Sequence, residues 1–463
     1  MKMGNPRGIV VIDVGYTNTK AILFSSDLKI VAKREMASVH RAIDLYTIID
    51  LEPVLKFLKS ALLELDRILP VDSIVPCAHG ACMVSLMQDG ALAVPVMDYA
   101  SQPPADIIAS YQKIEPPFSE VYCALLPMAL THGLQLFWQQ HLFPRYSEVV
   151  KTILPLMQYV AFRLCGIAAT EISSMSCQTQ LLDINTSKPS SLAIRQGWDA
   201  KFAPLQKAWT KLGPLKPEFK NQAFNGRGEV LAGVHDSNAN YLRYLAAGLE
   251  DFTLLSTGTW AISFNNAADI TKLDHAKDTN TNTDVLGQVV ACSRFFAGKE
   301  LEVIVAGVDA GLANLDGVQK VVENGIMALP SFTNSGGPLP STGNKGHITA
   351  AVDEIERASL ASLYCAQMVS LQLSAVQSSN QIIVDGPFAE NPVFLAVLGQ
   401  LRSPQKVYAS DLRDGTAAGA ACLALMENSS LPKIDLRLNK VEPARLSGLT
   451  EYMISWTNLA SPD

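Results

Sequence analysis

The sequence predicts an α/β protein of two domains, and three observations support this prediction. At 463 residues the chain is too long for one ordinary hydrophobic core, so two domains, or three, are expected. Apolar residues make up 48% of the chain and charged residues 17%, which is typical of a protein that buries a large core. The third observation is a repeat: each half contains an apolar strand, a turn of glycine and hydroxyl side chains, and a second apolar strand.

The first strand–turn–strand covers residues 8–24, and Asp13 ends its first strand. The turn and the start of the second strand supply Gly15, Thr17, Asn18 and Lys20. Gly15 is expected to allow a positive φ, and hydroxyls, backbone N–H groups and an ammonium can surround phosphate oxygens without a P-loop. Asp13 suits Mg²⁺, which prefers one or two carboxylates together with phosphate. The alternative is a polar β-hairpin that binds no ligand.

The order of the next elements argues against a Rossmann fold. The patterns predict a strand at 28–36, a helix at 51–68 with leucines on one face, and a strand at 73–79. Three strands precede the first helix, and the first strand is not followed by Gly-x-Gly-x-x-Gly, so a dehydrogenase is disfavoured. A loop is expected at 100–120, then helices at 130–141 and 147–165, the second kinked at Pro155.

We place the domain boundary after residue 225, where a polar and irregular stretch ends, which gives domains 1–225 and 226–463. The second half is expected to begin with a strand at 228–234 and a helix with Ser237 as its N-cap. The second strand–turn–strand then covers residues 252–264. Later elements are predicted as a helix at 350–378, a strand at 381–386, a helix at 391–401, a strand at 406–410 and a helix at 416–426.

Charge and composition disfavour several classes of protein. The net charge of −7 and the lack of a basic stripe argue against binding to nucleic acid. Because no apolar run reaches about 18 residues and the first residues lead straight into a strand, we expect no membrane span and a cytoplasmic location. The eight cysteines form no Cys-x-x-Cys pair and are expected to be reduced and buried, and the seven scattered histidines indicate no dedicated metal site.

Small polar residues directly follow apolar strands at three turns, 13–20, 256–259 and 385–391. Ligands of open α/β sheets bind where strand ends converge, so two glycine turns could clamp a triphosphate and the third could contact a nucleoside. Phosphoryl transfer depends mainly on such placement and on charge neutralisation. It also needs a carboxylate to accept the proton of the attacking hydroxyl, and Asp236 at the predicted start of a helix is our candidate. A helix-capping aspartate is the alternative.

Four ordered motifs resemble those of the FGGY carbohydrate kinases, and the resemblance runs almost end to end. They are Ile12-Asp-Val-Gly-x-Thr-Asn-Thr-Lys20, Gly233-Val-His-Asp236, Ser256-Thr-Gly-Thr-Trp260 and Gly386-x-x-x-x-Asn391. The short second and third motifs look more like the rhamnulokinase and fuculokinase side of the family. The resemblance implies two ribonuclease H-like domains of the actin/hexokinase type with an active-site cleft between them.

The resemblance also implies roles for individual residues. Asp236 would be the general base and Asp13 the Mg²⁺ ligand. The expected ATP-binding residues are Thr17, Asn18, Lys20, Gly258 and Thr259 for the phosphates and Gly337, Gly386 and Asn391 for the adenosine. The expected sugar-binding residues are His79, Asp98, His235 and Asp236. The chain departs from the family at Val96 and Ala100, where a Trp and an Arg are usual, and at Pro387 and Phe388, where glycines are usual.

The sequence thus predicts a kinase that uses ATP and Mg²⁺ to phosphorylate a ketose of the rhamnulose, fuculose, xylulose or ribulose type. The expected partners are the sugar and ATP, and dimers are common in such families. Two alternatives stay open: a polyol kinase of the glycerol or erythritol type, and a non-catalytic regulator that binds a nucleotide or sugar on the same scaffold.

Overall fold

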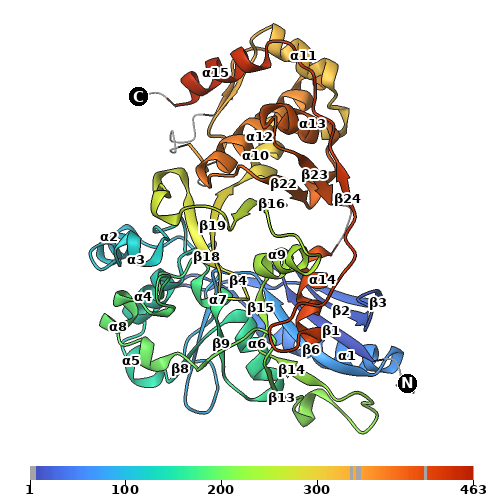
Figure 1. Ribbon diagram of the computed structural model, residues 1–463. Coiled ribbons are helices and arrows are strands. Elements are labelled where there is room, and N and C mark those ends of the chain that lie inside the picture. Colours follow the sequence, from blue (N-terminus) through green and yellow to red (C-terminus); the bar gives the residue numbers. More distant parts are fainter. Residues whose placement is uncertain (1–6, 334–336, 340–345, 411–413, 462–463) are drawn as a thin grey trace. The chain divides into compact units, whose positions relative to one another are not determined.

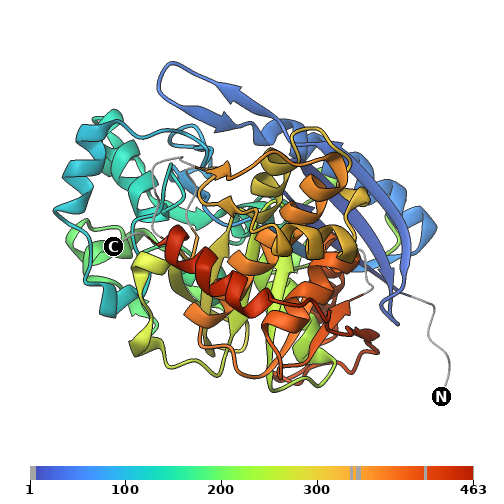
Figure 2. The same cartoon turned by 90° about the horizontal axis from the view of Figure 1, so that it is seen from above.

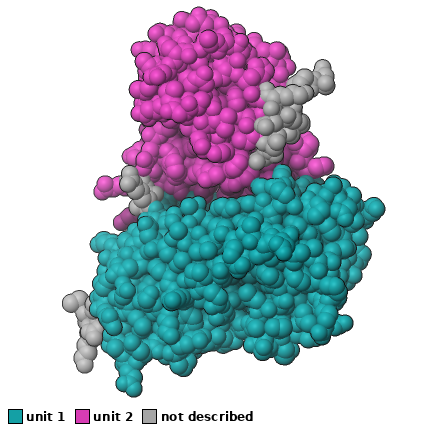
Figure 3. All heavy atoms as spheres, turned by 180° about the vertical axis from the view of Figure 1, so that it is seen from behind, with its two compact units in different colours: residues 1–248, 281–289, 414–434 teal, residues 249–280, 290–413, 435–463 magenta. Residues whose placement is uncertain are grey.

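The computed structural model describes residues 7–333, 337–339, 346–410 and 414–461. The chain forms two compact units, each built from separate segments (Figure 3). Unit 1 consists of residues 1–248, 281–289 and 414–434, and unit 2 of residues 249–280, 290–413 and 435–463. This division differs from the predicted boundary after residue 225, because the strands that follow residue 225 pair with the sheet of unit 1.

Unit 1 contains a mixed sheet with the strand order β13-β14-β6-β1-β2-β3, and β15 also pairs with β6 (Figure 1). Strands β1, β2 and β3 are antiparallel neighbours, whereas β6, β14 and β15 run parallel to β1. The bounds are β1 (Gly8–Val14), β2 (Asn18–Ser25), β3 (Ile30–Ala37), β6 (Val71–Ala78), β13 (Lys211–Pro214), β14 (Glu229–Leu231) and β15 (Val234–His235). The strands predicted at 8–24, 28–36 and 73–79 are confirmed.

The central position of β1 follows from its sequence, since a strand covered on both faces needs an unbroken apolar run. Residues 8–12 are all buried. Helix α1 (Leu51–Ile68) covers one face of this sheet with the predicted leucine stripe, and the side chain of Asp50 caps its N-terminus. Helices α9 (Asp236–Ala246) and α14 (Gly415–Cys422) share a buried cluster with the other face, and Figure 1 shows them side by side.

Two predictions in the first half are wrong. The expected loop at 100–120 contains helices α2 (Ala105–Gln112) and α3 (Phe118–Val121). The expected helix at 147–165 is divided, because Pro155 ends strand β8 (Thr152–Pro155) and α6 (Leu156–Cys165) begins after it. The other elements of unit 1 are β4 (His40–Ala42), β5 (Thr47–Ile49), β7 (Met83–Leu86), β9 (Thr170–Glu171), β10 (Leu182–Asp183), β11 (Lys188–Pro189), β12 (Leu205–Gln206), α4 (His132–Leu142), α5 (Tyr146–Val149), α7 (Ile172–Ser176), α8 (Ser191–Arg195), η1 (Asp199–Lys201), η2 (Pro217–Phe219) and η7 (Leu423–Leu425).

The sheet of unit 2 repeats the pattern, in the order β18-β19-β17-β16-β22-β23-β24. Strands β19, β17 and β16 are antiparallel neighbours, and β22 and β23 run parallel to β16. The bounds are β16 (Phe252–Thr257), β17 (Ala261–Asn265), β18 (Thr279–Thr283), β19 (Val289–Phe295), β22 (Gln381–Asp385), β23 (Val407–Ser410) and β24 (Leu438–Lys440). The strand–turn–strand predicted at 252–264 is confirmed.

Helix α12 (Glu354–Ala375) is the long helix of unit 2, and Asp353 and Glu356 form a capping box at its start. It shares a large buried cluster with the sheet and with α13 (Pro392–Leu401) and α15 (Leu449–Ala460), the red helix in Figure 2. The remaining elements are α10 (Ala297–Val305), α11 (Leu315–Glu323), β20 (Ala328–Leu329), β21 (His347–Ile348), η3 (Ile270–Lys272), η4 (His275–Lys277), η5 (Ala310–Leu312) and η6 (Pro387–Glu390).

The predicted α/β class is therefore confirmed, and the structure adds that the sheet of each unit is mixed, while the predicted cleft between domains stays a prediction. Within the described ranges, no helix has the length and hydropathy needed to cross a membrane. Every cysteine lies in the described part of the chain, none forms a disulfide, and all except Cys165 are buried.

Candidate active site

Three polar side chains of unit 1 follow neighbouring strands of one sheet. Strands β1 and β15 both pair in parallel with β6. Asp13 lies near the end of β1, His79 directly follows β6, and Asp236 directly follows β15. Because parallel strands end at the same edge of a sheet, these side chains gather there, and the charge of Asp236 acts on Asp13.

Asp13 is half-buried, and its pKa is raised to about 7. The largest cause is its removal from water, the next is the nearby charge of Asp236, and Lys20, which lies opposite in the β1–β2 ladder, opposes both. A divalent cation would relieve this accumulation of negative charge, so Asp13 fits the predicted Mg²⁺ ligand. Among the described residues, no three His, Cys, Asp or Glu side chains form a group that could hold a metal. A Mg²⁺ ion on Asp13 would take its other ligands from phosphate and water.

Asp236 is the first residue of α9. Its Oδ1 accepts a hydrogen bond from the N–H of Ser237 at 2.6 Å and lies 3.2 Å from Nε2 of His235. The side chain is 32% exposed, so the carboxylate is accessible to a bound hydroxyl. The prediction of Ser237 as N-cap is wrong, because the helix already begins at Asp236. His235 occupies the cap position, and the Ser237 hydroxyl donates to Asp236 at 3.2 Å.

The turn after β1 exposes Thr17 and Asn18 and leaves Lys20 half-buried. Gly15 does not adopt the positive φ predicted for it. A glycine is needed for a different reason: its N–H donates to the carbonyl of Asn18 at 3.0 Å, and a Cβ there would lie 2.9 Å from that oxygen. The turn is therefore tight, and its hydroxyl and amide side chains are free of the core.

Sequence reasoning missed Asp414, which lies just before α14. Its Oδ1 lies 3.3 Å from Nζ of Lys20 and 3.6 Å from Nζ of Lys33. Asp414 has a φ of +58°, a conformation that non-glycine residues rarely adopt. The signal that could have found it is an aspartate before Gly415 and Thr416, at the start of a helix of small residues.

Asp98 lies in a network that sequence reasoning only partly found. Its side chain is 1% exposed, and its Oδ2 lies 2.7 Å from Nδ1 of His40. The hydroxyl of Tyr16 donates to the same oxygen at 3.3 Å, and the N–H of Ala100 donates to Oδ1 at 2.8 Å. His40 and Tyr16 were not predicted, since neither lies in a strand–turn motif with Asp98.

Aromatic rings line the same region. The ring of Tyr16 lies 4.4 Å from that of His40 and 4.7 Å from that of Tyr99, centroid to centroid. His79 approaches Tyr99 edge-on at 5.6 Å. Tyr16 and Tyr99 are both half-buried, so parts of their surfaces stay accessible. Ring surfaces beside a few fixed polar groups are typical of small-molecule sites.

The histidines near Asp236 are buried and electrically neutral. Burial lowers the pKa of His79 and of His235, and it lowers the pKa of His132 to about 4. Nδ1 of His235 lies 3.4 Å from the amide nitrogen of Asn238. At pH 7 these imidazoles can exchange hydrogen bonds with hydroxyl groups without adding positive charge.

In unit 2, the turn after β16 and the turn after β22 are in contact. Gly386 has a φ of +85°, and a Cβ there would lie 2.0 Å from the carbonyl oxygen of Thr257. The hydroxyl of Thr257 accepts from the N–H of Phe388 at 3.1 Å, which joins the two turns. Gly258 is half-buried and Thr259 is exposed, so this turn presents backbone and hydroxyl groups at the surface of the unit.

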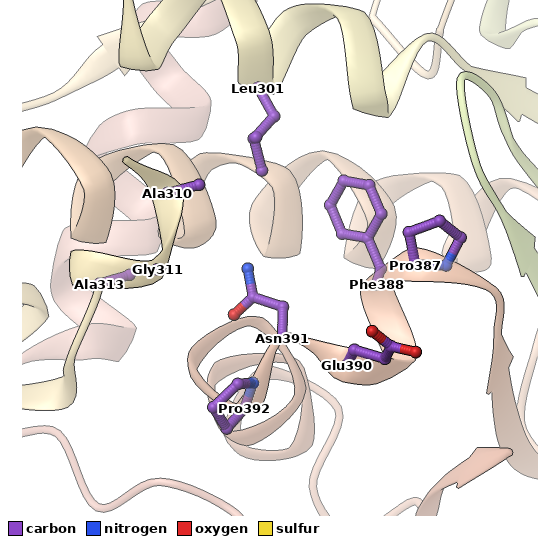
Figure 4. Close-up of a pocket in the computed structure, with 9 residues that line it drawn as sticks. All are labelled: Leu301, Ala310, Gly311, Ala313, Pro387, Phe388, Glu390, Asn391 and Pro392. Atoms are coloured by element: carbon purple, nitrogen blue, oxygen red, sulfur yellow. The ribbon is translucent and has the colours of Figure 1, made fainter. Parts of the chain in front are cut away.

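A pocket of about 300 Å³ lies beside η6 and the start of α13 (Figure 4). Leu301, Phe388 and Asn391 point into the same space in this view. The lining is mainly apolar and consists of Leu301, Ala310, Gly311, Ala313, Pro387, Phe388, Glu390, Asn391 and Pro392. The side chain of Asn391 also caps α13, through Oδ1 to the N–H of Phe394 at 2.9 Å.

Gly337 does not line this pocket. Its N–H donates to Oδ2 of Asp278 at 3.2 Å, and Asp278 forms a nearly buried ion pair with Arg294 at 3.0 Å. The guanidinium of Arg294 lies 5.1 Å from the ring centroid of Trp260. The structure thus connects Gly337 to Trp260, next to the turn of Gly258 and Thr259.

Comparison with known proteins decides the family. A carbohydrate kinase from Novosphingobium aromaticivorans is 31% identical over 99% of both chains, with a TM-score of 0.86. Residues 249–432 match the family profile described as carbohydrate kinase FGGY, C-terminal domain. The chain belongs to the FGGY carbohydrate kinase family. It is a phosphotransferase with an alcohol group as acceptor.

More distant structures share the fold of this FGGY kinase. A xylulose kinase from Lactobacillus acidophilus is 14% identical over 98% of this chain and 96% of its own, with a TM-score of 0.80. A Plasmodium falciparum glycerol kinase solved with ADP is 13% identical over 99% and 98%, with a TM-score of 0.78. Comparison with curated protein sequences gives no significant match. These likenesses support the predicted two-domain, actin-like fold class and leave the acceptor open.

The predicted site residues of the kinase divide between the two units. Unit 1 holds the sugar-binding, metal and base candidates together with Thr17, Asn18 and Lys20, and unit 2 holds Gly258, Thr259, Gly337, Gly386 and Asn391. The predicted base therefore lies in the unit of the N-terminal strands, although it was assigned to the C-terminal domain.

Proposed function

We propose that this FGGY kinase transfers the γ-phosphoryl group of Mg·ATP to a hydroxyl of a neutral ketose. The first candidates are 6-deoxyketohexoses and ketopentoses of the rhamnulose, fuculose, xylulose and ribulose types. The observation that carries the proposal is the closeness of Asp13, near the end of β1, and Asp236, directly after β15, because these strands flank β6 and the two carboxylates interact through their charges. Asp13 suits the role of metal ligand, and Asp236 suits the role of proton acceptor.

Asp236 accepts the proton of the acceptor hydroxyl as its oxygen attacks the γ-phosphorus. The bond between the γ-phosphorus and the bridging oxygen breaks, and ADP leaves with the electron pair. General-base help of this kind contributes about 10²–10⁴-fold to the rate. Asp13 would hold the Mg²⁺ ion, which neutralises phosphate charge when bound. The hydrogen bond from the N–H of Ser237 at the start of α9 orients the Asp236 carboxylate.

Each unit offers suitable groups for the nucleotide. In unit 1, the exposed Thr17 and Asn18 and the ammonium of Lys20 suit phosphate oxygens. In unit 2, the turn of Gly258 and Thr259 offers backbone N–H groups, and the apolar pocket beside Gly386 and Asn391 has the size and lining expected for an adenine ring.

The charges near Asp236 favour a neutral acceptor. His79 and His235 have lowered pKa values and are neutral at pH 7, and Asp98 is acidic. An acceptor with its own carboxylate would gain no ion pair from these imidazoles, and Asp236 would repel it. A ketose or polyol carries only hydroxyl and carbonyl groups and fits these partners better than a sugar acid.

The test is ADP release by the purified kinase with Mg·ATP and a panel of ketoses, polyols and aldonates. We expect turnover with at least one ketose, none above background with aldonates, and none with Asp236→Asn. Phosphorus NMR of the product would then identify the phosphorylated hydroxyl. Turnover only with glycerol or erythritol would support the polyol alternative. A complete lack of acceptor-dependent ADP release would overturn the proposal.

A further inference from the structure

We infer that His40 is a positioning residue of the acceptor site and that it fixes Asp98 and Tyr16 in the arrangement that selects the acceptor. This inference rests on the proposed function and deepens it. His40 lies in β4, outside every motif that resembles the family. It nevertheless has the shortest contact to the Asp98 carboxylate, 2.7 Å from Nδ1 to Oδ2.

His40 forms hydrogen bonds through both of its ring nitrogens. Nε2 lies 2.8 Å from the carbonyl oxygen of Tyr16, and Nδ1 lies 2.7 Å from the carboxylate of Asp98. A carbonyl oxygen can only accept a hydrogen bond. The carboxylate already accepts from the Tyr16 hydroxyl and from the N–H of Ala100, so it also acts as an acceptor. Nε2 therefore donates to the Tyr16 carbonyl, and Nδ1 shares a hydrogen bond with the Asp98 carboxyl group, so the ring ties Tyr16 and Asp98 together.

His40 supplies a basic side chain that the chain lacks next to Asp98 in the sequence. Ala100 stands two residues after Asp98, where the resembling family segment has an arginine. The basic partner of Asp98 comes instead from 58 residues earlier in the chain. Backbone pairing delivers it: His40 lies opposite Ile49 in the β4–β5 hairpin, Ile48 bridges to Met97, and the N–H of Asp98 donates to the carbonyl of Thr47 at 2.9 Å.

The contact between His40 and Asp98 is important because the Asp98 carboxylate is buried. The Asp98 side chain is 1% exposed and that of His40 is 23% exposed. A buried carboxylate that loses its hydrogen-bonded partner becomes protonated or moves toward water. Either change would release the hydroxyl of Tyr16, whose ring lies between those of His40 and Tyr99. His40 would therefore control the polar and aromatic surface offered to the acceptor without touching the reacting atoms.

The experiment measures KM and kcat of His40→Ala for the best acceptor of the panel and for ATP. We expect the acceptor KM to rise at least about tenfold, because the buried Asp98 carboxylate loses a hydrogen-bonded partner, while kcat and the KM for ATP change less than about threefold. The matched control is His141→Ala in α4, since this exposed histidine hydrogen-bonds to the carbonyl of Phe137 and packs against the Phe137 ring, within its own helix. We expect it to behave as the unmodified kinase.

A rescue variant separates positioning from general stabilisation. His40→Ala combined with Ala100→Arg returns a basic side chain to the vicinity of Asp98, and we expect the acceptor KM to recover at least in part. Tyr16→Phe removes only the hydroxyl bond of 3.3 Å and should raise the acceptor KM by about threefold. It provides a second readout if His40→Ala fails to fold.

Two results would overturn the inference. The first is an acceptor KM within twofold of the unmodified kinase for a folded His40→Ala, or for Tyr16→Phe if that variant replaces it. The second is a fall in kcat together with a similar rise in the KM values for the acceptor and for ATP, which indicates general damage to the fold. If the unmodified kinase phosphorylates no acceptor, the proposed function fails first and this inference falls with it.

Discussion

Lys20 and Asp414, 394 residues apart in the chain, form an ion pair of 3.3 Å within unit 1. Lys33 contacts the same carboxylate at 3.6 Å. Asp414 also contributes to the raised pKa of Asp13. Asp414 is therefore ion-paired with Lys20, the lysine that the proposed mechanism assigns to a phosphate. The phosphates of an incoming nucleotide have to compete with Asp414 for this ammonium.

Replacing Asp414 should tighten nucleotide binding. Asp414→Asn removes a negative charge from Lys20 and Lys33, so we expect the dissociation constant for Mg·ATP to fall about two- to fivefold, in line with the small energies of partly exposed ion pairs. Isothermal titration calorimetry measures this change. Asp27→Asn is the matched control, because Asp27 forms an exposed ion pair with Lys29 on the hairpin that joins β2 and β3. Weaker binding by Asp414→Asn would contradict this role.

Replacing Asp236 should separate binding from catalysis. Asp236→Asn keeps the shape of the side chain and removes the proton acceptor, so we expect kcat to fall at least about 10²-fold. The affinity for Mg·ATP should stay within twofold, measured by calorimetry on the same preparation. Retention of more than a few per cent of turnover would remove Asp236 from the base role.

Replacing Asp13 should change stability in a pH-dependent way. Its pKa of about 7 lies above the ordinary value of 3.8, so the fold disfavours the ionised form. The free energy of unfolding therefore falls as the pH rises from about 4 to 7, and the full loss of stability from Asp13 is present above pH 7. In EDTA and without nucleotide, we expect Asp13→Asn to be more stable than the unmodified kinase at pH 8, by about 1–4 kcal/mol. The two should be nearly equal at pH 4. Thermal or urea unfolding measures both proteins. If Asp13→Asn and the unmodified kinase differ in stability by the same amount at pH 4 and pH 8, the raised pKa of Asp13 is contradicted.

Two glycines of unit 2 should respond differently to alanine. Gly386 has a φ of +85° and a ψ of −164°, and its Cβ would overlap the carbonyl of Thr257. We expect Gly386→Ala to destabilise the kinase by about 2–5 kcal/mol. A Cβ on Gly258 meets nothing within 4 Å, so Gly258→Ala should retain its stability and weaken ATP binding if phosphate approaches this turn. Urea unfolding and calorimetry on both variants test the pair.

The sequence predicted the sheets and the strand ends of the site well, because long apolar strands and leucine stripes carry strong periodic signals. The prediction failed where local chemistry decides the outcome. Pro155 ended a strand instead of kinking a helix, and Gly15 was needed for close packing instead of a positive φ. His40 and Asp414 were missed for another reason: their partners are distant in the chain, and only the folded sheet brings them together.

The interleaved segments of unit 1 also bear on how the chain folds during synthesis. Ala417 and Ala420 of α14 belong to the same buried cluster as Val11 of β1 and Leu242 of α9. A nascent chain that has emerged only as far as residue 248 lacks this part of its core, so its first sheet stays partly uncovered until residues near 434 leave the ribosome. Cutting the gene into two halves should therefore yield fragments that aggregate unless they are made together.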